Sequence, residues 1–329
     1  SDAEYDALER ELRDLEAAYP LLADPGSPTR RVGAPPVEFF PKAAHGTTML
    51  SLENAYIPKG LRDAEGVKDW TDAETWPDGW ESEVLEWVQR MSRDLNGAGH
   101  SQKASDIIFV TELKVDGLSL ALRYRNRRLV QAITRGDGVT GEDVTENART
   151  VADIPLELPE DAPENLEVRG EVFLSRKRWE ELNRDLDAVG ETRFANPRNA
   201  ASGTMKLLDS REVARRRLSF LPWQVLGEED HEAAMDQLTK WGFNRMPATI
   251  RGGLIDVLAF IRQQAEARHR LAFDTDGVVI KVKDLELQHL LGATEHHPRW
   301  ALAFKYPALQ ATTKVQGITW QVGRTGKLT

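Results

Sequence analysis

Cysteine is absent from the 329 residues of this chain. No disulfide framework and no thiolate zinc site can therefore form within them, which suits a reducing compartment such as the cytosol. Long apolar runs are absent too, because no stretch approaches the roughly 20 apolar residues that a membrane-spanning helix requires. Nothing resembles a signal peptide. With 40% apolar residues the chain can build one large globular domain or two.

Several common catalytic and metal-binding signatures are also missing. The sequence contains no Walker A motif, no nucleophile elbow and no HExxH motif. The seven histidines are scattered, and the pair His296 and His297 before Pro298 is more typical of a surface loop than of a metal site. The Gly-rich stretch "RGDGVTGED" lacks EF-hand spacing and a dinucleotide-binding fingerprint, so it predicts a hairpin turn.

Charge is distributed unevenly along the chain. The net charge of -10 arises in residues 1–110, which hold 21 acidic and 11 basic side chains, while the remainder is neutral. Within that neutral part, residues 193–217 carry seven basic side chains against Asp209 and Glu212. They are Arg193, Arg198, Lys206, Arg211, Arg215, Arg216 and Arg217. Such a local excess of positive charge favours contact with a phosphate backbone.

The order of apolar patterns predicts an α+β fold without regular βαβ alternation, which argues against a doubly wound parallel sheet. An N-terminal helix over 1–19 precedes a Pro/Gly linker at 24–36, and an acidic, Trp-rich segment at 58–106 contains one predicted helix over 81–95. Strands are predicted at 107–115, 119–134, 166–174, 218–226, 277–283, 300–306 and 315–322. Helices are predicted at 175–189, 231–241 and 254–269, and "RGDG" and "DTDG" are predicted turns.

Four of the predicted strands place charged side chains on one face. In "TELKVDGLSL" (111–120), Glu112, Lys114 and Asp116 point to the same side, because side chains alternate along a strand. The same pattern occurs for Glu167, Arg169 and Glu171, for Lys281 and Lys283, and for Lys305 beside the small Ala301 and Ala303. Each face alone is compatible with a solvated surface. Four such faces in apolar surroundings predict a shared polar cleft for an anionic ligand.

This combination of residues suits phosphoryl chemistry. A lysine is nucleophilic once it loses its proton, and burial beside other cations such as Lys281 and Lys305 favours that neutral form. The remaining cations can bind phosphate oxygens. Carboxylates such as Glu112 and Glu171 can hold ribose hydroxyls, a base amine or Mg²⁺. The residues therefore predict a nucleotide or phosphoryl enzyme with a candidate lysine nucleophile.

Ten short sequence motifs occur along the chain in a recognisable order. They are "DAEYDAL", "SPTRRVG", "MLSLENAY", "ELKVDG", "TRGDGVTGEDVTENARTV", "LEVRGEVFL", "FANPRNAASGTMKLLD", "FDTDGVVIKV", "WALAFKYPA" and "QVGRTG". In this order the chain resembles the adenylation domain of the NAD-dependent bacterial DNA ligases, except at about 57–106, which looks like an insertion. The resemblance implies an antiparallel-sheet nucleotidyltransferase domain with an N-terminal helical subdomain and the start of an OB-fold.

The resemblance also implies roles for individual residues. Lys114 would attack the α-phosphorus of NAD⁺, release nicotinamide mononucleotide and keep AMP as a phosphoramide, and Asp116 would orient or activate it. Adenylate recognition is implied for Ser51, Leu52, Glu112, Arg135, Glu171, Lys281 and Lys305. Asp2, Ala3, Glu4, Tyr5 and Asp6 match the nicotinamide-side segment. Arg198 matches a DNA-backbone contact, as does Lys206, where many relatives have arginine.

Further expectations concern partners and boundaries. The family uses NAD⁺ with Mg²⁺ or Mn²⁺, acts in the bacterial cytoplasm near the nucleoid in replication and repair, and seals nicked duplex DNA as a monomer. Its zinc site lies in C-terminal regions beyond this sequence. We expect a helical unit at 1–38, a nucleotidyltransferase domain at 39–308, and a linker with a first OB-fold strand at 309–329. The family's tyrosine-histidine element before "DAEYD" is absent, so we expect weak self-adenylation. The OB-fold resemblance stops after its first strand, and the family's later regions are missing, so we expect poor nick sealing.

Two other functions are compatible with parts of the sequence. An ATP-dependent ligase would share the lysine motif, but the segments "DAEYD" and "MLSLENAY" argue against it. A non-catalytic DNA-binding module would require the loss of a site residue, and none of the matched residues is substituted.

Overall fold

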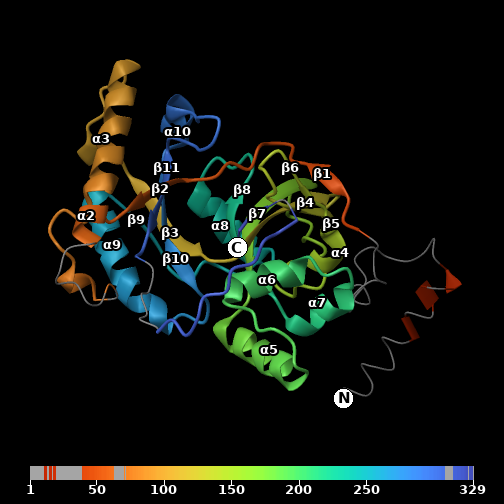
Figure 1. Ribbon diagram of the computed structural model, residues 1–329. Helices are drawn as coiled ribbons and strands as arrows, with labels where there is room; N and C mark the ends of the chain where they lie inside the picture. The colour runs from red at the N-terminus through yellow and green to blue at the C-terminus, as the bar shows by residue number, and fades with distance from the viewer. Residues whose placement is uncertain are drawn as a thin grey trace.

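The fold is described from a computed structural model of the chain (Figure 1). The structure describes residues 11–12, 15–16, 18–19, 39–62, 70, 72–307, 314–324 and 326–328. The described part of the predicted N-terminal helix is helical at 11–12, 15–16 and 18, and the rest of that prediction lies outside the described residues. The linker predicted at 24–36 lies outside them as well.

One wall of the fold is a five-stranded sheet with the strand order β2-β11-β10-β3-β9. β2 and β11 run parallel, and the other neighbours are antiparallel. Its strands are β2 (Glu53–Tyr56), β3 (Phe109–Val115), β9 (Thr249–Gly252), β10 (Thr275–Val282) and β11 (Ala301–Lys305). The alternation along β10 buries Val278, Ile280 and Val282 in the core on one side. The charged side chains of the same strands are therefore left on the other side.

The second wall is a four-stranded antiparallel sheet with the order β5-β4-β7-β8. Its strands are β4 (Leu118–Arg125), β5 (Arg128–Thr134), β7 (Asn165–Phe173) and β8 (Ser219–Val225). Leu120, Leu122, Val168 and Phe220 form the centre of its core. A short pair, β1 (Lys42–Ala44) with β6 (Thr140–Glu142), lies beside it. The antiparallel pairing confirms that this is not a doubly wound parallel fold.

Helices cover the outer faces of both sheets (Figure 1). Next to the five-stranded sheet are α2 (Lys59–Arg62), α3 (Ser82–Gly97), α9 (Leu254–Ala267) and α10 (Leu285–Leu291). Next to the four-stranded sheet are α4 (Thr145–Ala148), α5 (Arg176–Ala188), α6 (Pro197–Met205), α7 (Ser210–Arg216) and α8 (His231–Lys240). The predicted helices at 81–95, 175–189, 231–241 and 254–269 are confirmed. Those at 197–205, 210–216 and 285–291 were not predicted.

The acidic, Trp-rich segment contributes to the core of the five-stranded wall. Trp87 lies on α3 at helical spacing with Val84, Val88, Met91 and Leu95, and all five side chains are buried. Trp76 and Trp80 pack edge to face at 5.0 Å between ring centroids, and both contact Phe304 of β11. The segment is acidic on its surface but supplies aromatic core to the domain.

Two local predictions are wrong. "DTDG" is not a hairpin turn, because Thr275, Asp276 and Gly277 begin β10. The predicted strand at 315–322 is not formed by residues 314–324, where the backbone makes only an isolated bridge from Val322 to Leu328. A strand is stabilised by a ladder of hydrogen bonds to a neighbour, and among the described residues this stretch forms no ladder beyond that bridge, where Gly323 N donates to Lys327 O at 2.8 Å. The turn predicted at "RGDG" is confirmed, since Gly138 N donates to Arg135 O at 2.9 Å.

Candidate functional site

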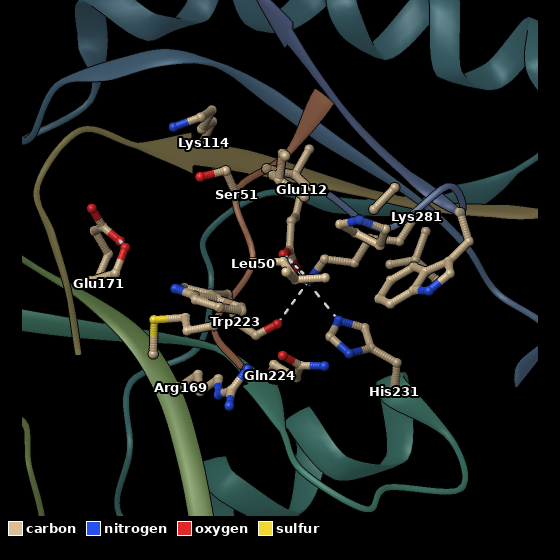
Figure 2. A pocket seen from close by; sticks show the side chains of 18 of the residues that line it. Leu50, Ser51, Glu112, Lys114, Arg169, Glu171, Trp223, Gln224, His231 and Lys281 are labelled. Carbon is tan, nitrogen blue, oxygen red and sulfur yellow. Dashed lines mark hydrogen bonds and ion pairs between the residues drawn. The ribbon is translucent and has the colours of Figure 1, made fainter. Parts of the chain in front are cut away.

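A cavity of about 510 Å³ lies between the two sheets, where the charged faces predicted from the sequence meet. Its lining includes β3, β10 and β11 from one wall and β7, β8 and the start of α8 from the other (Figure 2). The structure brings nine of the predicted site residues into this lining. They are Ser51, Leu52, Glu112, Lys114, Arg135, Glu171, Arg198, Lys281 and Lys305. The shared polar cleft is therefore confirmed as a structural feature.

One end of the cavity holds two lysines that share a carboxylate. Lys114 Nζ lies 3.2 Å from Asp276 Oδ1, and Lys305 Nζ lies 3.0 Å from Asp276 Oδ2. The strand register explains this arrangement, because Gly277 pairs with Lys114 on β3 and with Lys305 on β11. A Cβ at Gly277 would lie 1.9 Å from the Phe304 carbonyl oxygen, so only glycine permits this close approach. Asp276 was not among the predicted site residues.

Glu171 and Asp116 lie beside Lys114 but do not bind it. Burial raises the pKa of Glu171 to about 7, although Ser119 Oγ donates to its carboxylate at 2.7 Å and Lys114 and Arg198 lie nearby. Arg198 Nη1 donates to Asp116 Oδ1 at 2.7 Å. In the structure Asp276, and not Asp116, contacts the amine of Lys114, since Asp116 follows the last residue of β3 and turns toward α6.

The other end of the cavity holds a buried ion pair. Lys281 Nζ donates to Glu112 Oε1 and also, at 2.8 Å, to the carbonyl oxygen of Trp223. The indole ring of Trp223 lies 5.9 Å from the same ammonium. Burial would raise the pKa of Glu112, but Lys281 and His231 outweigh it and hold that pKa below its usual value. Trp223 and His231 were missed by the sequence analysis.

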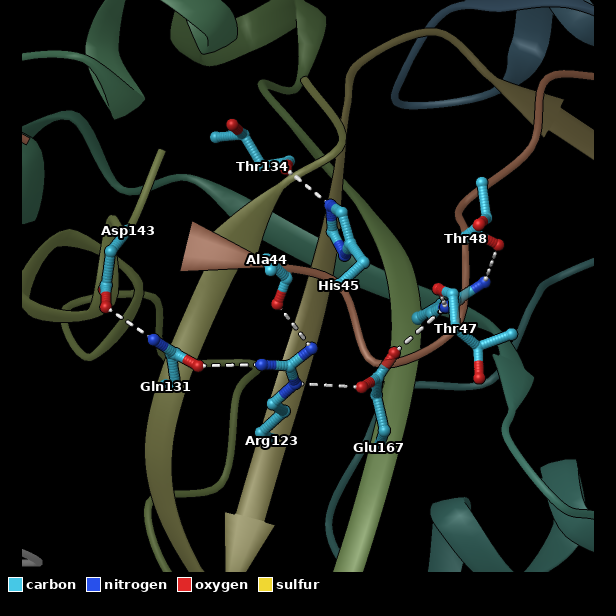
Figure 3. Close-up of polar contacts among 10 residues, drawn as sticks. Ala44, His45, Thr47, Thr48, Arg123, Gln131, Thr134, Asp143 and Glu167 are labelled. Atoms are coloured by element: carbon cyan, nitrogen blue, oxygen red, sulfur yellow. Dashed lines mark hydrogen bonds and ion pairs between the residues drawn. The ribbon is translucent and has the colours of Figure 1, made fainter. Parts of the chain in front are cut away.

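A segment at 45–52, which we call the strap, crosses the cavity wall and is held from the four-stranded sheet (Figure 3). The guanidinium of Arg169 donates to the carbonyl oxygens of Thr47 and, at 3.3 Å, Thr48. Arg123 Nη2 donates to Ala44 O at 2.9 Å, and its Nε donates to Glu167 at 2.9 Å. These bonds fix the backbone that carries Ser51 and Leu52 into the cavity. Arg169, expected on a charged face of the cleft, does line the cavity, and its almost fully buried guanidinium also supports the strap.

Comparison with known proteins identifies the family. The family model described as "NAD-dependent DNA ligase adenylation domain" matches residues 79–309 of the chain. The chain belongs to this family. A second family model, described as "DNA ligase-like, N-terminal NAD+-binding domain", matches residues 1–33. The family assignment made from the motifs is therefore confirmed.

Curated relatives of this adenylation domain are named DNA ligase. The chain is 44% identical to the DNA ligase of Solibacter usitatus (strain Ellin6076) over 335 residues. It is 42% identical to those of Natranaerobius thermophilus (strain ATCC BAA-1301 / DSM 18059 / JW/NM-WN-LF), over 335 residues, and Rubrobacter xylanophilus (strain DSM 9941 / JCM 11954 / NBRC 16129 / PRD-1), over 334 residues. Each alignment covers 100% of this chain and 46%, 46% and 45% of the relative, respectively. The chain thus spans about half the length of the curated relatives it matches.

The basic residues at 193–217 of the adenylation domain are mostly paired with acidic neighbours. Lys206 Nζ lies 2.8 Å from Glu142 Oε2, and Arg211 Nη2 lies 2.7 Å from Asp209 Oδ2. Arg216 lies over the ring of Phe194, with its Cζ 5.7 Å from the centroid. Arg198 is the member of this set that lines the cavity. The local excess of positive charge is thus partly neutralised within α6, α7 and their neighbours.

The remaining predicted residues of the adenylation domain lie at the cavity rim or outside the described part. Arg135 is exposed, and its backbone N donates to Ser119 O at 3.1 Å. Asp2, Ala3, Glu4, Tyr5 and Asp6 lie outside the described residues. Within the described part, no helix is long and apolar enough to cross a membrane.

Proposed function

We propose that this chain transfers the adenylate of NAD⁺ to Lys114 and forms a lysyl-AMP. The family assignment supports NAD⁺ as the nucleotide. The single observation that carries the proposal is the position of Lys114 in the cavity. The amines of Lys114 and Lys305 both contact the carboxylate of Asp276, and the buried Glu112–Lys281 ion pair lies at the other end of the cavity. This spacing fits a ligand with an anionic phosphate at one end and a hydrogen-bonding base at the other.

At the Lys114 end, the chain's own groups account for the movement of charge and protons. The Nζ–P bond forms while the bond from the α-phosphorus to the bridging oxygen breaks, and its electron pair leaves with the phosphate of nicotinamide mononucleotide. Asp276, at 3.2 Å, accepts the proton of the Lys114 amine. Lys305 neutralises charge on the phosphate oxygens. We assign Asp116 to holding Arg198 beside this end rather than to activating Lys114 directly.

At the other end, Glu112 and Lys281 recognise the base. An anionic carboxylate accepts hydrogen bonds from an exocyclic amine, and an ammonium donates to a ring nitrogen. The indole of Trp223 offers a face for stacking. We assign Ser51 and Leu52, on the strap, and Arg135 and Glu171 to the sugar and phosphate part of the ligand.

A divalent cation fits this site only as a partner of the nucleotide. Among the described residues no group of three acidic, histidine or cysteine side chains is placed to hold a metal ion. Mg²⁺ is commonly held by one or two carboxylates together with substrate phosphates. Glu171 and Asp116, which lie close enough to influence each other's charge, are the carboxylates that would hold it. When bound, the ion would neutralise phosphate charge.

Beyond self-adenylation, we propose that the AMP passes to the 5′-phosphate of a nick in duplex DNA in the longer protein. Arg198 and Lys206 would then contact the DNA backbone. We also propose the units 1–38, 39–308 with the aromatic-rich segment 57–106, and 309–329 leading toward an OB-fold. We propose further that the longer protein is a monomer in the bacterial cytoplasm and acts in replication and repair. Its zinc site would lie in regions beyond this chain.

Intact mass after incubation with NAD⁺ and Mg²⁺ tests the proposed function. We expect a gain of one adenylyl group in the wild-type chain and no gain in Lys114→Ala. Lys240→Ala is the matched control, because this exposed lysine at the end of α8 lies outside the cavity. Release of nicotinamide mononucleotide, and no labelling from ATP, would separate this activity from that of an ATP-dependent ligase. A covalent AMP that survives Lys114→Ala would refute the assignment.

A further inference from the structure

His231 is a buried histidine at the cavity that the adenylation chemistry proposed above does not use. It is the first residue of α8 and is 7% exposed. Figure 2 shows its ring beside Lys281 and Glu112, at the far end of the cavity from Lys114. The ring therefore does not touch the reacting atoms. Any contribution to the reaction must act through a neighbouring residue.

The contacts of His231 identify Glu112 as that neighbour. His231 Nδ1 lies 2.9 Å from Glu228 Oε1, and Nε2 lies 3.5 Å from Glu112 Oε2. The other oxygen of Glu112, Oε1, accepts from Lys281. Each oxygen of this buried carboxylate thus faces a different basic group. The two basic groups come from opposite walls, since Lys281 lies on β10 and His231 on the helix that packs on β8.

The charges around His231 favour its protonated form. Burial lowers the pKa of His231, as does Lys281, but the hydrogen bonds and charges of Glu112 and Glu228 outweigh both and place the pKa above its usual value. Next to it, Asp230 is paired with Lys283 of β10 at 3.1 Å. Glu232 lies 4.0 Å from the same lysine. While the ring is protonated, the imidazolium can donate to Glu228 and to Glu112 at once.

The loss of this ring would leave Glu112 with Lys281 as its single basic partner. A buried carboxylate with one partner can rotate about its terminal torsion, which is broad for glutamate. The rotation would move the acceptor oxygens away from the ligand. A buried acceptor oxygen left without a partner also costs free energy. Orientation and charge are therefore both controlled from the His231 side.

We propose that His231 is a positioning residue for nucleotide recognition. Glu228 holds its ring, and the ring fixes the carboxylate of Glu112 in the orientation that receives the base amine of NAD⁺. This inference rests on the proposed function of the cavity. It adds a residue that sets the affinity for the nucleotide without taking part in the attack by Lys114. We use KM for the NAD⁺ concentration that gives half the maximal rate of lysyl-AMP formation, and kcat for that maximal rate. The signature of this role is a change in KM that leaves kcat nearly unchanged.

The first test measures lysyl-AMP formation against NAD⁺ concentration for His231→Gln. We expect KM to rise about tenfold, which corresponds to the loss of one of the two basic partners of a buried carboxylate, and kcat to stay within about twofold. The matched control is His289→Gln, an exposed histidine on α10 outside the cavity, which should leave both parameters unchanged. A fall in kcat with unchanged KM, or no change in either, would overturn the proposal.

A pH series on the wild-type chain tests the same idea without a substitution. Because His231 holds Glu112 while it is protonated, KM for NAD⁺ should rise as the pH passes upward through the raised pKa of His231. His231→Gln should show a flat KM over the same range. A wild-type KM that falls or stays constant with rising pH would contradict the proposal, even if the variant fails to fold.

A double-mutant cycle separates action through Glu112 from an independent effect. If His231 acts through Glu112, His231→Gln should add little to the loss in Glu112→Gln, whereas independent effects would multiply. Calorimetric titration with AMP repeats the cycle without the covalent step. If the wild-type chain binds AMP but is not labelled by NAD⁺, the proposed function fails while the role of His231 is still measured. Multiplying effects in the AMP titration would refute that role alone.

Discussion

Lys114 and Lys305 share the carboxylate of Asp276, whose side chain is 22% exposed, whereas the carboxylate of Glu112 at the other end of the same cavity is 3% exposed. Asp276 contacts two lysines of its own five-stranded sheet. Glu112 lies between Lys281 of that sheet and His231 from the wall of the four-stranded sheet. Removing a charge from water costs free energy unless the charge is well paired. The buried pair of Glu112 and Lys281 is therefore suited to holding the base of the ligand in one fixed orientation. The more open end can exchange partners at lower cost, which suits bond making and breaking.

The largest expected effect of a substitution within this comparison is at the open end. Asp276→Asn removes the group proposed to accept the proton of Lys114, so adenylation at saturating NAD⁺ should slow by about 100-fold, in the usual range for a lost general base. KM should change little, because the buried end is intact. Single-turnover formation of lysyl-AMP measures both quantities.

Asp274→Asn is the control for that substitution. Asp274 lies two residues earlier and accepts from Arg176 Nε at 2.6 Å, away from Lys114. Its loss should leave the rate within about threefold of wild type, as expected for a partly exposed ion pair. Equal rates for the two variants would show that Asp276 has no special part in the transfer.

A second effect is the dependence of stability on pH at Glu171. Its pKa is about 7 in the folded chain against an ordinary value of 4.5, so the folded state binds the extra proton between these values. Stability should therefore fall as the pH rises from about 4.5 to about 7, by on the order of 2 kcal/mol from this residue. Glu171→Gln should remove that part of the slope in urea unfolding.

The control for Glu171 is Glu160→Gln, an exposed glutamate outside the cavity. This variant should keep the wild-type slope. If Glu171→Gln and Glu160→Gln gave the same stability difference between about pH 5 and about pH 7.5, the raised pKa of Glu171 would be excluded. The comparison between the variants cancels the titration of the other groups.

The smallest expected effect concerns the strap. Arg169→Lys keeps the charge but cannot reach Thr47 O, Thr48 O and Glu167 together, because an ammonium lacks the planar fork of a guanidinium. KM for NAD⁺ should rise by about fivefold through the displaced Ser51 and Leu52, with kcat unchanged. Arg125→Lys, at the exposed end of β4, is the control and should have no effect. An unchanged KM in Arg169→Lys would show that the strap does not depend on it.

The sequence predicted the polar faces well because alternation along a strand is local. Alternation alone predicts one cleft for Glu112, Lys114, Lys281 and Lys305, without the pairing of the strands, and all four side chains line the cavity. The helices α3, α5, α8 and α9 were likewise readable from their spacing. These features need only the residues of one segment.

Asp276, Trp223 and His231 were missed because their roles depend on contacts between distant segments. "DTDG" has the composition of a turn, and the shared position beside two lysines appears only when Gly277 is paired with both neighbouring strands. Trp223 contributes its backbone carbonyl as well as its ring, which no residue pattern reveals. Arg169 was placed on the correct face, but its burial under the strap follows from the fold of residues 44–52.

The path of the strap sets a mechanical limit on the cavity. Before it, β1 pairs with β6 beside the four-stranded sheet; after it, β2 pairs with β11 in the five-stranded sheet. Ala44 is thus paired with β6 beside the four-stranded wall and Glu53 with β11 in the five-stranded wall, with the eight residues of the strap between them. Peptide length along this stretch limits how far the walls can separate, so the cavity works as a slot of bounded width. A residue added to the strap would loosen that bound without altering any side chain that contacts the ligand.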